Sequence, residues 1–327
     1  MFIRFFKNNN PSYFFILPVF ALVFWIVAFL HPPVLVSSHS TILFDALAKY
    51  INLIPLVGTS VSFLLVIAGS FLINFVVNEN EITDRKTFLP ALFYIVIMSN
   101  NEAMLVFHPA MLANLFIIFA LHKMMNAYRK NSAFSEVFDA GFLLSMASVF
   151  YFPSVILFPV LGFGLFIFRT FNWRELFVSF LGVCVPYCFV VTYYFWNDSL
   201  MDYWNDKLAY FIYHERPSFD FSSSFYFLLF TGGVIALLSF SKLSATVLLG
   251  SQKTKKNVLF FIWFFVICIG SLFPAPELSS PYFAVLAIPF SVFATNYFFN
   301  MKKEIWGEFF FLLFIASILI NDFAKYF

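Results

Sequence analysis

Charged side chains are scarce in this sequence. Only 11% of the 327 residues are Asp, Glu, Lys or Arg, whereas a soluble domain averages about a quarter. Such a chain cannot cover a water-facing surface with charge, and its 54 Phe residues would make that surface less soluble still. The composition therefore excludes a soluble enzyme. It also excludes a disordered chain, because disorder goes with low hydrophobicity and high net charge.

Cysteine is scarce, and phosphate-binding loops are absent. The three cysteines, Cys184, Cys188 and Cys268, all lie inside apolar runs, so they indicate packing residues and not a disulfide scaffold. No His or carboxylate lies near them in sequence, and we expect no metal site and no cofactor, with use of a divalent cation left open. No glycine-rich phosphate loop is present. The net charge of +2, without a dense basic run, excludes a nucleic-acid partner.

Apolar residues make up 62% of the chain and fall into long segments. We count eleven, at roughly 13–30, 53–77, 87–98, 104–121, 134–152, 154–168, 176–196, 222–240, 258–273, 282–299 and 305–320. A membrane-spanning helix needs about 20 residues, so the shorter segments predict tilted, broken or re-entrant helices. Pro153 divides the run 134–168 into a hairpin or a kinked pair. The fold class expected is all-α: one polytopic transmembrane helical bundle over residues 1–327.

The distribution of Lys and Arg predicts the orientation of this bundle. With a cytoplasmic N-terminus and alternating sides, 15 of the 19 cations fall in cytoplasmic connections, as the positive-inside rule expects. The outer side keeps only Lys49, Lys207, Arg216 and Lys325. We therefore expect a multi-pass protein of a bacterial inner membrane with its C-terminus outside.

Two outer connections contain amphipathic stretches. In Thr41–Ile54 the apolar residues recur at helical spacing, with Asp45 and Lys49 on the opposite face. Asp198–Glu215 repeats this pattern. Both predict helices that lie in the outer membrane interface.

Candidate catalytic residues lie on the same outer side. Asp45 is the acid in the first outer connection, where a carboxylate could serve as general base on an acceptor hydroxyl. Lys49 follows one turn later as a candidate cation for substrate, and the alternative for both residues is a surface i,i+4 ion pair. Glu102 is the second candidate acid, and its alternative role is to cap the segment that follows.

Candidate substrate-binding residues are Arg216, His214 and His108. A planar guanidinium suits phosphate oxygens, which makes Arg216 the first candidate for a phosphate contact and His214 its helper. The alternative for Arg216 is a loop ion pair with Glu215 or Asp220. His108 precedes Pro109 at a break in the fourth apolar segment, at the mouth of a helix.

Four stretches share a pattern of apolar segments punctuated by small residues, prolines and basic turns: Thr41–Ile54, Ala140–Val160, Asn172–Tyr187 and Lys255–Phe299. This pattern resembles the GT-C type of polytopic glycosyltransferase. The resemblance implies transfer of a sugar from a polyprenyl-phosphate donor on the outer face, where Asp45 would have to substitute for the family's acidic motif. The sequence is similar, too, to multi-pass bacterial inner-membrane proteins that share this helix pattern.

Two other function classes stay open. GT-C enzymes place an acidic motif directly after the first helix, where this chain has His31-Pro32-Pro33-Val34. That departure favours a non-catalytic subunit of an envelope secretion, motility or polymer-export assembly, whose partner is then a protein complex. A lipid or solute transporter is the third class, although no carboxylate lies near the middle of an apolar segment. Membrane lipids are expected partners in every case.

Overall fold

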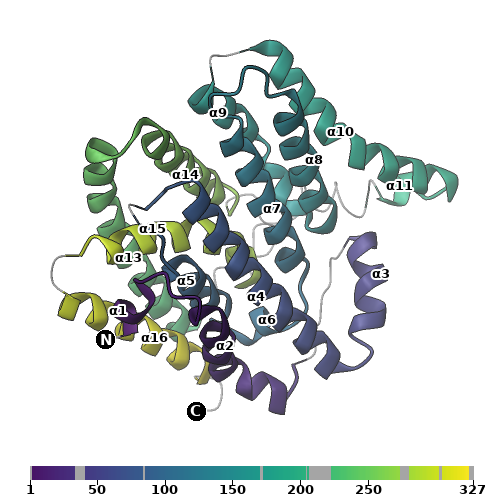
Figure 1. The fold of residues 1–327 in the computed structure, drawn as a ribbon. Helices are drawn as coiled ribbons and strands as arrows, with labels where there is room; N and C mark the ends of the chain where they lie inside the picture. The colour runs from purple at the N-terminus through teal and green to yellow at the C-terminus, as the bar shows by residue number, and fades with distance from the viewer. Residues whose placement is uncertain are drawn as a thin grey trace.

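A computed structural model describes residues 2–33, 41–83, 85–169, 172–203, 205, 222–272, 280–301 and 304–323. Within these ranges the chain is helical and contains no strand (Figure 1). The helices are α1 Phe2–Phe6, α2 Tyr13–Leu30, α3 Ile42–Ile51, α4 Pro55–Glu79, α5 Leu89–Met98, α6 Glu102–Leu105, α7 Pro109–Asn126, α8 Phe134–Phe150, η1 Phe152–Leu157, α9 Pro159–Phe168, α10 Trp173–Trp196, α11 Leu200–Tyr203, α13 Ser223–Leu249, α14 Gln252–Gly270, η3 Ser280–Leu286, α15 Ala287–Phe299 and α16 Glu304–Phe323.

Each of the eleven apolar segments coincides with helical structure. Four helices in the described ranges are long and apolar enough to cross a membrane: α2, α4, α10 and the Ser223–Leu243 part of α13. Helix α5 has 10 residues and is therefore only about 15 Å long, too short to cross alone. The all-α fold is thus confirmed, together with four helices of membrane-spanning length.

Proline breaks the longest apolar run, as its chemistry requires. Helix α8 ends at Phe150, and Pro153 lies in the short 3₁₀ helix η1 that precedes α9. Proline has no N–H to donate, so a helix cannot continue through it without losing a hydrogen bond. The expected division of residues 134–168 into two helices is confirmed.

The short helix α5 lies at the centre of the bundle. It packs between α4 and α15, and nine of its ten residues are buried. Helix α7 packs on α4 and α8, whereas α10 lies at the edge and contacts mainly α8 (Figure 1). Because lipid is as apolar as these side chains, van der Waals packing and interhelical hydrogen bonds must hold the helices together.

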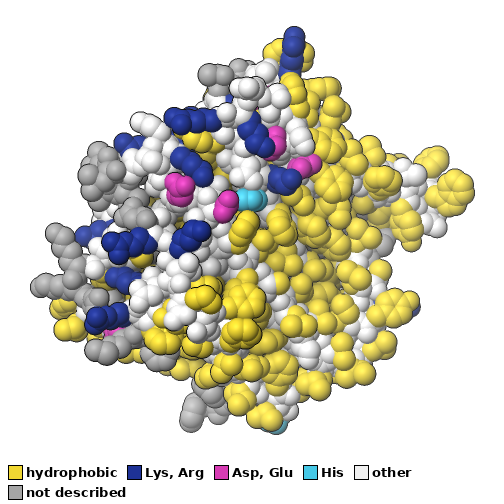
Figure 2. Space-filling view, in the orientation of Figure 1, with side chains coloured by type: hydrophobic (Ala, Val, Ile, Leu, Met, Phe, Trp, Pro, Cys, Tyr) yellow, Lys and Arg dark blue, Asp and Glu magenta, His cyan; other side chains and the backbone are white. Residues whose placement is uncertain are grey.

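Lys and Arg gather at one end of the molecule. Figure 2 shows them along the upper-left edge of the visible face, while hydrophobic side chains cover most of the face toward the lower right. Hydrogen bonds join the connections at this basic end: Phe88 N–H donates to Phe6 O at 3.1 Å, and Thr254 Oγ1 donates to Glu81 O at 3.0 Å. These connections are the ones that the charge bias places in the cytoplasm.

The connection that follows α5, which is expected on the outer side, is joined to α2 and α16. Trp25 Nε1, five residues before the end of α2, donates to Ser99 Oγ at 3.0 Å. Asn321 Nδ2 in α16 donates to the Asn100 carbonyl at 2.8 Å. Segments far apart in sequence thus meet at the same end, an arrangement that suits helices running back and forth across a bilayer.

The first amphipathic stretch is helical, as predicted, and forms α3. Its Phe44 is fully buried, whereas Leu43, Leu47 and Tyr50 are exposed. Of the second stretch, Leu200–Tyr203 forms α11, and residues 206–215 lie outside the described ranges.

Candidate functional site

Helices α8 and α10 approach each other closely in their first halves. A Cβ on Gly141 would lie 2.3 Å from the Ser179 carbonyl oxygen, and a Cβ on Gly182 would lie 2.4 Å from the Phe138 carbonyl oxygen. Only glycine permits such backbone contact, which is the usual role of small residues at helix crossings in membranes. Ser145 Oγ adds a hydrogen bond across the crossing, to Val183 O at 2.8 Å.

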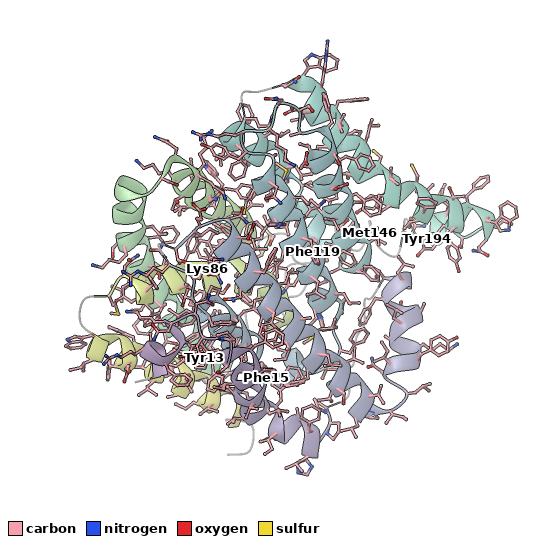
Figure 3. All side chains as sticks on the ribbon, viewed as in Figure 1. Tyr13, Phe15, Lys86, Phe119, Met146 and Tyr194 are labelled. Atoms are coloured by element: carbon pink, nitrogen blue, oxygen red, sulfur yellow. The ribbon has the colours of Figure 1, made fainter. Side chains whose placement is uncertain are left out.

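Beyond this crossing, the second halves of α8 and α10 and the helix α3 line an open pocket. Its volume is about 490 Å³, within the range of small-molecule sites. Figure 3 shows two of its residues, Met146 and Tyr194, on the side of the bundle that faces α3. The lining residues are Thr41, Leu43, Ala46, Phe142, Met146, Val149, Pro186, Phe189, Val190, Tyr193 and Tyr194.

Two contacts hold α3 over this pocket. Thr41 Oγ1, just before α3, donates to the carbonyl of Phe150 at the end of α8, at 2.9 Å. Phe44 stacks on Phe107 with 4.9 Å between ring centroids. One face of α3 is therefore anchored on the bundle, and its neighbouring face, with Leu43 and Ala46, forms a wall of the pocket.

The chemistry of the lining points to an apolar ligand. Polar atoms in the lining come only from Thr41, Tyr193 and Tyr194 and from the backbone, and no charged side chain or histidine lines the pocket. Such walls contribute mainly dispersion contacts and few hydrogen bonds along a ligand. The arrangement suits a hydrocarbon chain. In the ranges that the structure describes, no group of His, Cys, Asp and Glu is placed to hold a metal ion.

The candidate base Asp45 lies on α3, next to this pocket. Asp45 and Lys49 are both exposed, one turn apart, while Leu43 and Ala46 on the same helix line the pocket. Glu102 is the first residue of α6, and the cap of that helix is the preceding Asn101, whose side chain accepts a hydrogen bond from Ala103 N–H at 3.3 Å. The capping role considered for Glu102 thus belongs to Asn101.

His108 caps α7. Its Nδ1 accepts a hydrogen bond from Ala110 N–H at 3.1 Å, and its ring lies edge-on to Tyr151. A ring nitrogen that accepts a hydrogen bond carries no proton, so the His108 ring is neutral in this arrangement. Phe107 beside it carries the stack with Phe44, which brings α3 and the start of α7 together. The candidates Arg216 and His214 lie outside the described residues.

Sequence reasoning missed the pocket residues of α8 and α10. Gly141, Gly182 and Pro186 lie in two of the stretches that carry the GT-C resemblance, and small residues at these positions are the available signal for a close crossing. No pattern within one helix shows which partner it meets. Nothing in the sequence therefore indicates that Met146 and Tyr194 line the same pocket.

The profile of one family matches residues 1–327, and its description is "Family of unknown function (DUF6427)". The chain belongs to this family. It matches no curated protein. It matches no solved structure either. The likeness of this DUF6427 chain to GT-C enzymes accordingly stays a proposal.

Proposed function

We propose that this chain is a multi-pass protein of the bacterial inner membrane that binds the hydrocarbon chain of a lipid between α3, α8 and α10. The observation that carries the proposal is the apolar pocket of about 490 Å³ beside an amphipathic helix. The pocket lies by the second halves of α8 and α10, away from the turn 127–133 and its cations. By the charge bias, this is the outer half of the membrane.

We propose further that the lipid is a polyprenyl-phosphate sugar donor and that its sugar is transferred on the outer face. A branched, unsaturated isoprenoid chain suits walls made of Phe142, Met146 and Phe189. Asp45, exposed on the pocket helix, would act as the base on the acceptor hydroxyl. Arg216 would contact the phosphate, with Lys49, His214, His108 or Glu102 assisting.

The first test is native mass spectrometry of the gently solubilised full chain. We expect a bound polyprenyl-phosphate species that Met146→Trp reduces at least about tenfold, because the larger ring fills the pocket. The matched control is Leu237→Trp, a substitution at a residue on α13 that is 73% exposed and outside the pocket lining. If Met146→Trp lowers the melting temperature, Ala46→Phe replaces it, because Ala46 lines the pocket but is itself exposed, so a larger side chain there disturbs no core contact.

Three results would overturn lipid binding at this site. One is equal lipid occupancy in the pocket variant and in Leu237→Trp. The second is absence of any retained lipid, and the third is a stoichiometric protein partner in its place. The last of these would favour a subunit of an envelope assembly.

The transfer step needs a separate test. Asp45→Asn keeps the size of the side chain but removes its basicity, so we expect it to abolish sugar transfer in a purified assay while the lipid stays bound. Asp139→Asn, at the basic end of the molecule, is the carboxylate control and should keep transfer. Unchanged transfer in both Asp45→Asn and Arg216→Ala would refute the glycosyltransferase proposal and leave lipid binding standing.

A further inference from the structure

Two cations from different parts of the chain share one aromatic ring at the basic end. The Arg129 guanidinium lies 5.2 Å from the Tyr128 ring centroid, and Lys256 Nζ from α14 lies 5.1 Å from the same centroid. The two charges can be no further apart than the sum of these distances, which is close to the Debye length of ~10 Å at 0.1 M salt. They therefore repel each other, and the ring compensates only part of this cost.

The turn that carries Arg129 is held in place. Arg169, at the end of α9, donates to the carbonyls of Ala127, Lys130 and Asn131 at 3.3, 2.5 and 3.3 Å. Arg129 itself has a φ of 60°, a left-handed conformation that is unfavourable for a residue with a Cβ. Such a conformation persists where the surrounding contacts fix it. The position of the Arg129 charge is thus built into the fold.

Three of the nearby acids pair with other cations, and two more, Glu79 and Glu81, are exposed beside the first turn of α14. Lys130 pairs with Glu136, Arg169 with Glu175 at 2.7 Å, and Lys123 with Asp139 at 2.7 Å.

Arg129 and Lys256 form no ion pair with any residue in the described part of the chain. The first turn of α14 also contains Lys253 and Lys255 and no acid, so the cations there outnumber the neighbouring Glu79 and Glu81.

We infer that Arg129 and Lys256 bind the phosphate group of an anionic phospholipid headgroup, with the Tyr128 ring beside it. One phosphate between the two cations would replace their repulsion by two charge-assisted contacts. The site lies at the end where Lys and Arg gather, which the charge bias places at the cytoplasmic leaflet (Figure 2). It lies at the opposite end of α8 from the apolar pocket, and it does not depend on that pocket's function.

The test is a native mass spectrometry titration of the full chain with phosphatidylglycerol and, separately, with phosphatidylcholine. Lys256→Gln should weaken phosphatidylglycerol binding about twentyfold or more, because it removes a direct charge-assisted contact to the phosphate. Lys255→Gln is the matched control: it removes the same charge from the adjacent residue, which does not contact the ring, and should cost about fivefold or less, the loss expected for one cation near an anionic surface. Phosphatidylcholine binding should not change in either variant.

Arg129→Asn provides a second variant, since Asn tolerates a positive φ and the turn should keep its shape. It should weaken phosphatidylglycerol binding as Lys256→Gln does. Equal losses in Lys255→Gln and Lys256→Gln would show a diffuse surface potential and overturn the site. Displacement of phosphatidylglycerol by millimolar inorganic phosphate would show that the pair takes the free ion, and would overturn the lipid as its ligand.

Discussion

Gly141 and Gly182 place the backbones of α8 and α10 in direct contact. The space for a Cβ at each position is occupied by a carbonyl oxygen of the opposite helix, at 2.3 and 2.4 Å. Neither oxygen can move aside as the end of a flexible side chain could. This contact fixes where the two helices cross, and hence where the pocket beyond the crossing begins.

Gly182→Ala should therefore separate the helices and destabilise the protein by about 1–3 kcal/mol, the usual cost of overpacking. The control is Gly162→Ala in α9, where an added Cβ meets nothing within 4 Å. That change should be neutral or stabilising, because Ala favours a helix over Gly by about 1 kcal/mol. Thermal unfolding in detergent measures both, and equal effects would contradict the proposed crossing.

Ser99 links α2 to the end of α5. It is fully buried, accepts from Trp25 Nε1 at 3.0 Å and donates to Ile95 O at 2.8 Å. Ser99→Ala leaves the buried indole N–H without its acceptor and should cost about 1–2 kcal/mol. Ser70→Ala is the control, since Ser70 is equally buried and donates to the carbonyl of Ile67 in its own helix. Denaturant unfolding should show a loss for Ser99→Ala alone.

The Arg169–Glu175 pair should matter far more than the Lys123–Asp139 pair, although both have 2.7 Å between nitrogen and oxygen. The Glu175 side chain is 2% exposed, so Glu175→Gln leaves the mostly buried Arg169 guanidinium without a counter-ion and should cost about 3 kcal/mol. The side chains of Lys123 and Asp139 are 40% and 37% exposed, and Asp139→Asn should cost about 1 kcal/mol or less. Comparable losses in the two variants would contradict this account.

The topology can be tested with single cysteines in a background where Cys184, Cys188 and Cys268 are replaced by Ala. A membrane-impermeant maleimide should label Lys49→Cys on intact cells. Lys130→Cys should react only after the membrane is opened, because the charge bias places the turn 127–133 in the cytoplasm. Labelling of both from the same side would refute the proposed orientation.

Much of the fold could be predicted from composition and spacing. The scarcity of charge predicted a helical membrane protein, and the apolar segments located the helices, since a spanning helix must satisfy its own backbone in lipid. The break at Pro153 and the helix near Asp45 followed from equally local chemistry. These features depend on a few consecutive residues, which a single sequence displays directly.

The candidate site was less predictable. Asp45 and His108 are candidate site residues by sequence only because they are isolated polar residues on the expected outer side. The structure shows His108 in a capping role and Asp45 exposed on the helix that walls an apolar pocket. The pocket itself escaped sequence reasoning, because its residues come from three helices and are as apolar as residues that face lipid.

Local hydrophobicity and charge are enough to predict that this chain is helical, where most of its helices lie, and which connections share an excess of cations. Folding in three dimensions sets three other features: Gly141 meets α10, α3 lines a pocket, and Arg129 and Lys256 converge on Tyr128. Each of these depends on which helix surfaces meet, and the van der Waals packing that selects them leaves no periodic trace in any one segment.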